Sequence, residues 1–159
     1  MTSQFSPKVS EILAFSREEA TRLGSRSVGP EHLLLGILRG NDGPVSELFS
    51  RQDINIQAIR AELEERVRDY TQNEPIITSE LVLNEKASNI LKLAVLEARV
   101  QHTQMVDVQH LLLAILHDRV DNGAKSVLEK NDMNYEDTLA YLQKRTMPSQ
   151  DGLGLSDDE

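Results

Sequence analysis

The sequence repeats itself once, and this repeat limits what the chain can fold into. The segment VGPEHLLLGIL, from Val28 to Leu38, returns 78 residues later as VDVQHLLLAIL, from Val106 to Leu116. A self-similarity at fixed spacing indicates one supersecondary unit that is used twice and buries its apolar face against its copy. The fold must therefore be interpreted as a pair, and the positions at which the copies differ are informative about each half.

The repeat extends well beyond this Leu-rich segment. Matching pairs at the same spacing include Ser10 and Ser88, Ile12 and Ile90, and Glu19 and Glu97. We place the copies at about residues 5–70 and 83–145, within a double-repeat domain of residues 1–146. Residues 147–159 are rich in Ser, Gly and Asp, and we expect an acidic disordered tail or linker there.

Each copy is predicted to form four helices. Apolar residues recur at helical spacing, and the Leu-rich helix is apolar nearly all round, which is typical of a buried centre. The small residues Gly36 and Ala114 occupy the same position and predict close helix packing there. We expect an all-α fold of eight helices, in two tandem four-helix repeats related by a pseudo-two-fold axis. The start signals are Ser6, Pro7, Pro30, Pro44 and Asn55 in the first copy and Asn84, Asp107 and Asn134 in the second. The β-branched run after Pro75, between the copies, is expected to be extended.

Composition excludes several classes of protein. Aromatic residues are only 4% of the chain and cysteine is absent, so the core must be aliphatic and no thiolate chemistry is available. The net charge is −9 and the basic residues are scattered among acids, which argues against nucleic-acid binding and favours partners with basic patches. No apolar run has the length of a membrane span, and the N-terminus lacks the pattern of a signal peptide. We therefore expect a cytoplasmic protein without a membrane partner.

No enzyme motif is present. The sequence contains no G-x-x-x-x-G-K-[ST], G-x-S-x-G or H-E-x-x-H, so this chain is not expected to be an enzyme. His32 and His110 begin the two Leu-rich helices, and each is interpreted as a half-buried imidazole that bonds a neighbouring backbone group. The alternative is a small metal-dependent enzyme built on His32, His110 and His117, but no carboxylate recurs at ligand spacing in both copies.

One of the equivalent positions at which the two copies differ in side-chain charge is Glu31 in the first copy and Gln109 in the second. Each side chain lies in the first turn of its Leu-rich helix, where a carboxylate stabilises the helix dipole by about 0.3–1 kcal/mol. That structural role requires no ligand. The functional alternative is that Glu31 receives a cationic group from a partner, whereas Gln109 keeps a hydrogen-bond acceptor without the charge.

The duplicated motif resembles the N-terminal domain of Clp ATPases, and the ClpC type in particular. The residues that carry the resemblance are GPEHLLLGIL from Gly29 to Leu38, after a helix that ends EATRLG at Gly24, and both are found near the start of the chain. The resemblance covers about residues 5–145. It implies a docking domain for adaptors and substrate polypeptides, in an AAA+ unfoldase that feeds a Clp peptidase. ATP and Mg²⁺ would bind to ATPase modules outside this chain, which itself needs no cofactor.

Some members of that family bind phosphorylated arginine on this domain. By position, Glu31 would pair with the guanidinium and Ser6 would be the hydroxyl residue that starts the first helix, with the phosphate near a helix N-terminus. Gln109 and Asn84 replace these residues in the second copy, and Pro30 replaces the usual hydroxyl residue before Glu31. The resemblance therefore implies phosphoarginine binding for the first copy only.

The favoured interpretation is a non-enzymatic docking domain of a ClpC-like unfoldase, monomeric in isolation. The alternative is a free-standing helical-repeat adaptor protein without ATPase modules. A reading frame that continues past Glu159 into a P-loop would separate the two.

Overall fold

The computed structural model describes residues 5–40, 43–71, 82–117, 119 and 121–146. The described part is all-α, as predicted, and its only β contacts are two isolated bridges. The extended run expected after Pro75 and the tail at residues 147–159 lie outside the described residues. The described residues form eight helices, which are α1 (Pro7–Arg22), α2 (Pro30–Gly40), α3 (Gly43–Arg51), α4 (Ile56–Thr71), α5 (Glu85–Val100), α6 (Val108–Leu116), α7 (Gly123–Lys130) and α8 (Tyr135–Thr146).

The helices begin where the sequence places capping side chains. Ser6 Oγ accepts a hydrogen bond from the Val9 amide, and the Asn84 side chain caps α5 in the same way by accepting from Ala87. The predicted caps Asn55, Asp107 and Asn134 are also confirmed. Each such side chain satisfies an amide that the first helical turn leaves without a partner. Asn122, which caps α7, was missed because the two copies lose their common spacing just before it.

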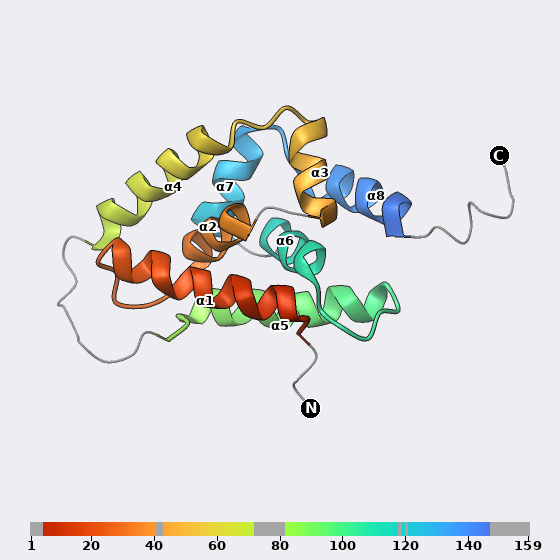
Figure 1. Ribbon diagram of the computed structural model, residues 1–159, viewed down its shortest axis with the longest axis horizontal. Helices are drawn as coiled ribbons and strands as arrows, with labels where there is room; N and C mark the ends of the chain where they lie inside the picture. Colours follow the sequence, from red (N-terminus) through yellow and green to blue (C-terminus); the bar gives the residue numbers. More distant parts are fainter. Residues whose placement is uncertain (1–4, 41–42, 72–81, 118, 120, 147–159) are drawn as a thin grey trace, which may run out of the picture.

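The two Leu-rich helices, α2 and α6, form the centre of the molecule. Their leucines and isoleucines are all less than 5% exposed. In Figure 1, α1 and α5 lie on one side of this pair, and α3, α4, α7 and α8 lie on the other. The predicted close approach at Gly36 is confirmed, because a Cβ there would lie 2.7 Å from the carbonyl oxygen of Ile12 on α1.

The two repeats exchange their N-terminal segments. Phe5 of the first repeat bridges to Val106 of the second, and Leu83 of the second bridges to Val28 of the first. Phe5 is equivalent to Leu83 and Val28 to Val106 at the 78-residue spacing, so the pseudo-two-fold axis relates one bridge to the other. The exchange continues in the outer helices, since α3 packs on α6 and α8, and α4 packs on α7.

Candidate functional site

The structure places Ser6 and Glu31 at opposite ends of α2. Because α1 and α2 form an antiparallel pair, the start of α1 lies beside the end of α2, where Lys8 comes near Gly40. Glu31 lies in the first turn of α2 instead. The family resemblance implied one site with Ser6 and Glu31 together, whereas the structure places these two side chains apart.

The exchange of N-terminal segments creates two different groupings. Ser6 lies at the start of α6, where its hydroxyl donates to Asp107 Oδ1 at 3.1 Å and its amide donates to Val106 O at 2.9 Å. Asn84 lies at the start of α2, where its amide donates to Val28 O at 2.9 Å. The structure thus brings Asn84 toward the helix that carries Glu31, and Ser6 toward the helix that carries Gln109.

Glu31 is enclosed by the second repeat. It is only 7% exposed, and a Cβ on Gly123 would lie 3.0 Å from its Cδ, with Oε2 closer still. Gly123 begins α7, so the carboxylate lies near two helix N-termini, where a negative charge is favourable. This location supports the structural role predicted for Glu31.

The same contact is open on the other side of the pseudo-two-fold axis. Gln109 is half-buried, and a Cβ on Gly43, the counterpart of Gly123, would have no described atom within 4 Å. Gly43 has a φ of 74°, a left-handed conformation that favours glycine. Gly123 has no such φ, and its lack of a side chain makes room for Glu31. The aligned glycines are therefore required for different reasons.

His32 and His110 bond neighbouring backbone groups, as predicted, but they are fully buried rather than half-buried. His32 Nδ1 accepts from the Gly29 amide at 2.9 Å, and His110 Nδ1 accepts from the Asp107 amide at the same distance. Burial lowers the pKa of His32 to about 4 and also lowers the pKa of His110. Both rings are therefore neutral at pH 7, with Nδ1 already occupied.

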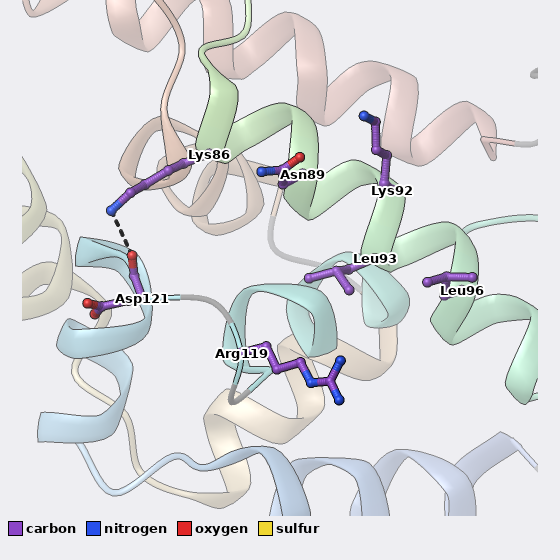
Figure 2. A pocket seen from close by; sticks show the side chains of 7 residues that line it. All are labelled: Lys86, Asn89, Lys92, Leu93, Leu96, Arg119 and Asp121. Atoms are coloured by element: carbon purple, nitrogen blue, oxygen red, sulfur yellow. Dashed lines mark hydrogen bonds between the residues drawn. The ribbon is translucent and has the colours of Figure 1, made fainter.

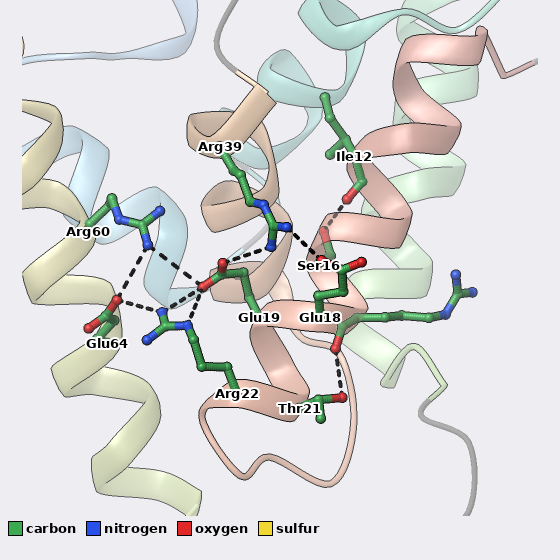
Figure 3. A network of polar contacts seen from close by, with 10 residues as sticks. Ile12, Ser16, Glu18, Glu19, Thr21, Arg22, Arg39, Arg60 and Glu64 are labelled. Carbon is green, nitrogen blue, oxygen red and sulfur yellow. Dashed lines mark hydrogen bonds and ion pairs between the residues drawn. The ribbon is translucent and has the colours of Figure 1, made fainter.

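A polar cluster that the sequence reasoning missed joins α1, α2 and α4. Figure 3 shows the carboxylate of Glu19, 4% exposed, among three arginines. Its oxygens lie 2.6 Å from Arg22, 3.3 Å from Arg39 and 3.9 Å from Arg60. Hydrogen bonds to Glu19 and Glu64 raise the pKa of Arg22. The signal was present in the sequence, because an acid within the apolar stripe of α1 recurs in α5.

That equivalent acid, Glu97, has a different partner. The hydroxyl of Tyr135 on α8 donates to Glu97 at 2.8 and 3.0 Å. Both buried carboxylates on the first helices are therefore paired inside the fold, Glu19 mainly by Arg22 of α1 and Arg39 of α2, and Glu97 by Tyr135 of α8. This position stabilises the fold and carries no open site.

A groove of about 450 Å³ lies along α5. Figure 2 shows its lining, with Leu93 and Leu96 between Lys92 and Arg119. Lys86 lies at the other end, where its ammonium donates to the carbonyl oxygen of Asp121 at 2.8 Å. Leu96 is 51% exposed, unusually high for a leucine in this fold. This group could not be predicted from the sequence, because Arg119 comes from the loop after α6 whereas the leucines lie on α5.

Among the described residues, no group of three or more His, Cys, Asp or Glu side chains could hold a metal ion. None of the described helices is long and apolar enough to cross a bilayer.

Comparisons with known proteins agree with the repeat and the fold. Residues 4–131 match the Clp repeat (R) N-terminal domain. Chaperone protein ClpC2 of Arabidopsis thaliana, a chloroplastic protein, is 30% identical over 81% of this chain, and chaperone protein ClpB of Oceanobacillus iheyensis is 28% identical over 74%. The matched segments span only 13% and 14% of those two proteins.

A solved structure shows the same arrangement of helices. The N-terminal domain of ClpD from Arabidopsis thaliana superposes with a TM-score of 0.71 at 22% identity, over 91% of this chain and 96% of that domain. The Hsp104 N-terminal domain from Candida albicans gives a TM-score of 0.72 at 16% identity, over 91% and 93%.

Proposed function

This chain belongs to the Clp repeat (R) N-terminal domain family, and we propose that it docks adaptor proteins and substrate polypeptides for a ClpC-like unfoldase. The observation that carries the proposal is the family match, which covers both repeats as far as α7. The described residues also form an aliphatic core, and the buried carboxylates of Glu19 and Glu97 are paired inside the fold, which leaves surface grooves as the places for binding.

The chemistry of the complete machine would lie outside this chain. Relatives are named as ATP-binding subunits of a Clp protease, and this chain has no P-loop of its own. In our proposal, ATP and Mg²⁺ bind to ATPase modules that follow the domain, and unfolded substrates pass to a Clp peptidase. The isolated domain is proposed to be a cytoplasmic, non-enzymatic monomer.

Removal of the domain tests this function. Deletion of residues 1–146 from the full-length protein should abolish adaptor-dependent degradation while basal ATP hydrolysis continues. If the truncated protein degrades adaptor-delivered substrates at the full rate, the docking function is wrong. The free-standing adaptor without ATPase modules remains the alternative, and the reading frame beyond Glu159 decides between them.

Phosphoarginine is a second candidate ligand. The exchange of N-terminal segments favours a site that combines Glu31 with Asn84, and a weaker counterpart that combines Gln109 with Ser6. The burial of Glu31 against Gly123 weighs against it.

Titration of the domain with free phosphoarginine tests this ligand by calorimetry. Saturable heat should disappear in Glu31→Gln, which gives the first repeat the amide that the second carries, and should persist in Gln109→Ala. A titration without saturable heat would remove phosphoarginine from consideration.

A further inference from the structure

The α5 groove has a charge opposite to that of the whole chain. The net charge of the chain is −9, yet among the described residues that line this groove Lys86, Lys92 and Arg119 outnumber the acid, Asp121. Neither the Lys92 nor the Arg119 side chain forms an ion pair with any residue of the described part. Side chains of like charge that gather on an oppositely charged protein and lack internal partners are suited to an external anion.

The floor of the groove is aliphatic. Leu93 is half-buried against the core and Leu96 is 51% exposed. Val100 lies one turn further along α5, beyond the groove lining, and is 72% exposed. These positions recur at helical spacing and form a stripe beside the cations. None of the described residues that line the groove is aromatic, so they offer no platform on which nucleic-acid bases could stack.

The first repeat closes the equivalent surface with its own side chains. Phe15 and Glu18 are the counterparts of Leu93 and Leu96. Arg39 covers both, with its guanidinium 4.4 Å from the centre of the Phe15 ring and 2.6 Å from Glu18 Oε1. The apolar side chain, the acid and the cation thus satisfy one another on α1.

The second repeat lacks this cover. The counterpart of Arg39 is His117, which packs edge-on against Tyr135 of α8 with ring centroids 5.5 Å apart. Leu96 replaces the acid. The first repeat contains its own acid beside an apolar side chain. The second repeat lacks that acid, so a partner could supply both groups.

We propose that the α5 groove binds an acidic polypeptide segment, in which leucine-like side chains flanked by Asp or Glu lie on Leu93 and Leu96 while the carboxylates pair with Lys92 and Arg119. This proposal rests on the docking function above and names the class of partner. It is specific to the second repeat, so the two halves of the domain present different surfaces to partners.

Fluorescence anisotropy with labelled peptides tests the proposal on the full 159-residue chain. Three peptides share the same leucines and differ only in the flanking residues, which are Asp and Glu, their amides Asn and Gln, or Lys and Arg. The acidic peptide should bind best, and its affinity should fall as salt is raised. Lys92→Ala and Arg119→Ala should each weaken it by about threefold to fivefold, as expected for exposed ion pairs.

Two further variants separate the apolar contribution from a general charge effect. Leu96→Ala should weaken the acidic peptide by about tenfold, because about half of a leucine side chain loses its burial on binding. Arg17→Ala, on the exposed face of α1, is the matched control and should leave binding unchanged. Circular dichroism verifies that each variant is folded.

Several outcomes would overturn the proposal. They are equal affinity for the acidic and amide peptides, binding that Lys92→Ala, Arg119→Ala and Leu96→Ala leave unchanged, and displacement of the acidic peptide by a single-stranded oligonucleotide. If deletion of residues 1–146 abolishes delivery while acidic peptides show no preference, the groove assignment fails and the docking function stands. If the peptide binds at α5 as described but the deletion has no effect, the docking function fails instead.

Discussion

Gly36 offers the sharpest test of how the repeat is packed. A methyl group added there would lie 2.5 Å from Ser16 Oγ and 2.7 Å from the carbonyl oxygen of Ile12, both on α1. Contacts under 3.0 Å are not tolerated, so one of the helices must move. The hydroxyl cannot turn away freely, because it donates to that same Ile12 carbonyl at 2.8 Å.

The size of the effect follows from two opposing contributions. Alanine is the better helix former by about 0.8–1.0 kcal/mol. Overpacking in a close-packed core costs about 1–3 kcal/mol, and the upper part of that range applies because one obstacle is backbone. We therefore expect Gly36→Ala to lower the free energy of unfolding by about 1–2 kcal/mol, measured by urea denaturation followed by far-UV circular dichroism.

The second repeat provides the matched control, because Ala94 and Ala114 occupy the places of Ser16 and Gly36. The double variant Ser16→Ala with Gly36→Ala reproduces that pair. It should recover only part of the loss, since the Ile12 carbonyl remains. An unchanged or increased free energy of unfolding for Gly36→Ala would refute the close approach of α1 and α2.

Three other perturbations follow from the structure. The buried His32 has a pKa of about 4 in the folded state against 6.5 for a free imidazole, so the unfolded state binds a proton more readily. The contribution of His32 to stability is therefore complete above pH 6.5 and is lost as the pH drops toward 4, by about 3 kcal/mol in total. Urea denaturation at pH 7 and pH 5 should show this decline, and an NMR titration should show a neutral His32 ring at pH 5.5, whereas a protonated ring at that pH would contradict the assignment. Leu112→Ala should cost about 2–5 kcal/mol through the cavity left at the centre of α6, and an unchanged melting temperature would show that α6 is not central. Gly123→Ala should destabilise the domain by about 1–3 kcal/mol, because the added methyl group displaces the Glu31 carboxylate. The double variant Gly123→Ala with Glu31→Ala should recover much of that loss. Equal stability of the wild type and Gly123→Ala would show that Glu31 does not lie against Gly123.

The sequence predicted the fold well because its signals are local. A capping side chain, a helix-starting proline and an apolar stripe each act within a few residues, so α1 and the caps at Ser6, Asn84 and Asp107 could be expected from the residues alone. The repeat then implied the second half from the first. Close packing at Gly36 was also predictable, because a small residue in an apolar helix allows a neighbouring helix to approach closely.

The candidate sites could not be predicted in the same way, because they depend on which segments meet. The family resemblance grouped Ser6 with Glu31 in the first repeat, whereas the antiparallel packing of α1 on α2 places them at opposite ends of α2. The enclosure of Glu31 depends on Gly123, and the α5 groove depends on Arg119. Each partner comes from a distant segment, and a single sequence contains no signal for that proximity.

The exchanged contacts give this single chain the construction of a symmetric dimer. The Phe5–Val106 and Val28–Leu83 bridges would form equally well between two identical copies of one repeat, each lending its first residues to the other. Joined end to end, two such copies can keep a shared centre at α2 and α6 while their surfaces diverge, as Arg39 and His117 have done. A homodimer must present two identical faces, whereas this linked pair presents two different ones, with Arg39 paired to Glu18 in the first repeat and His117 packed on Tyr135 in the second.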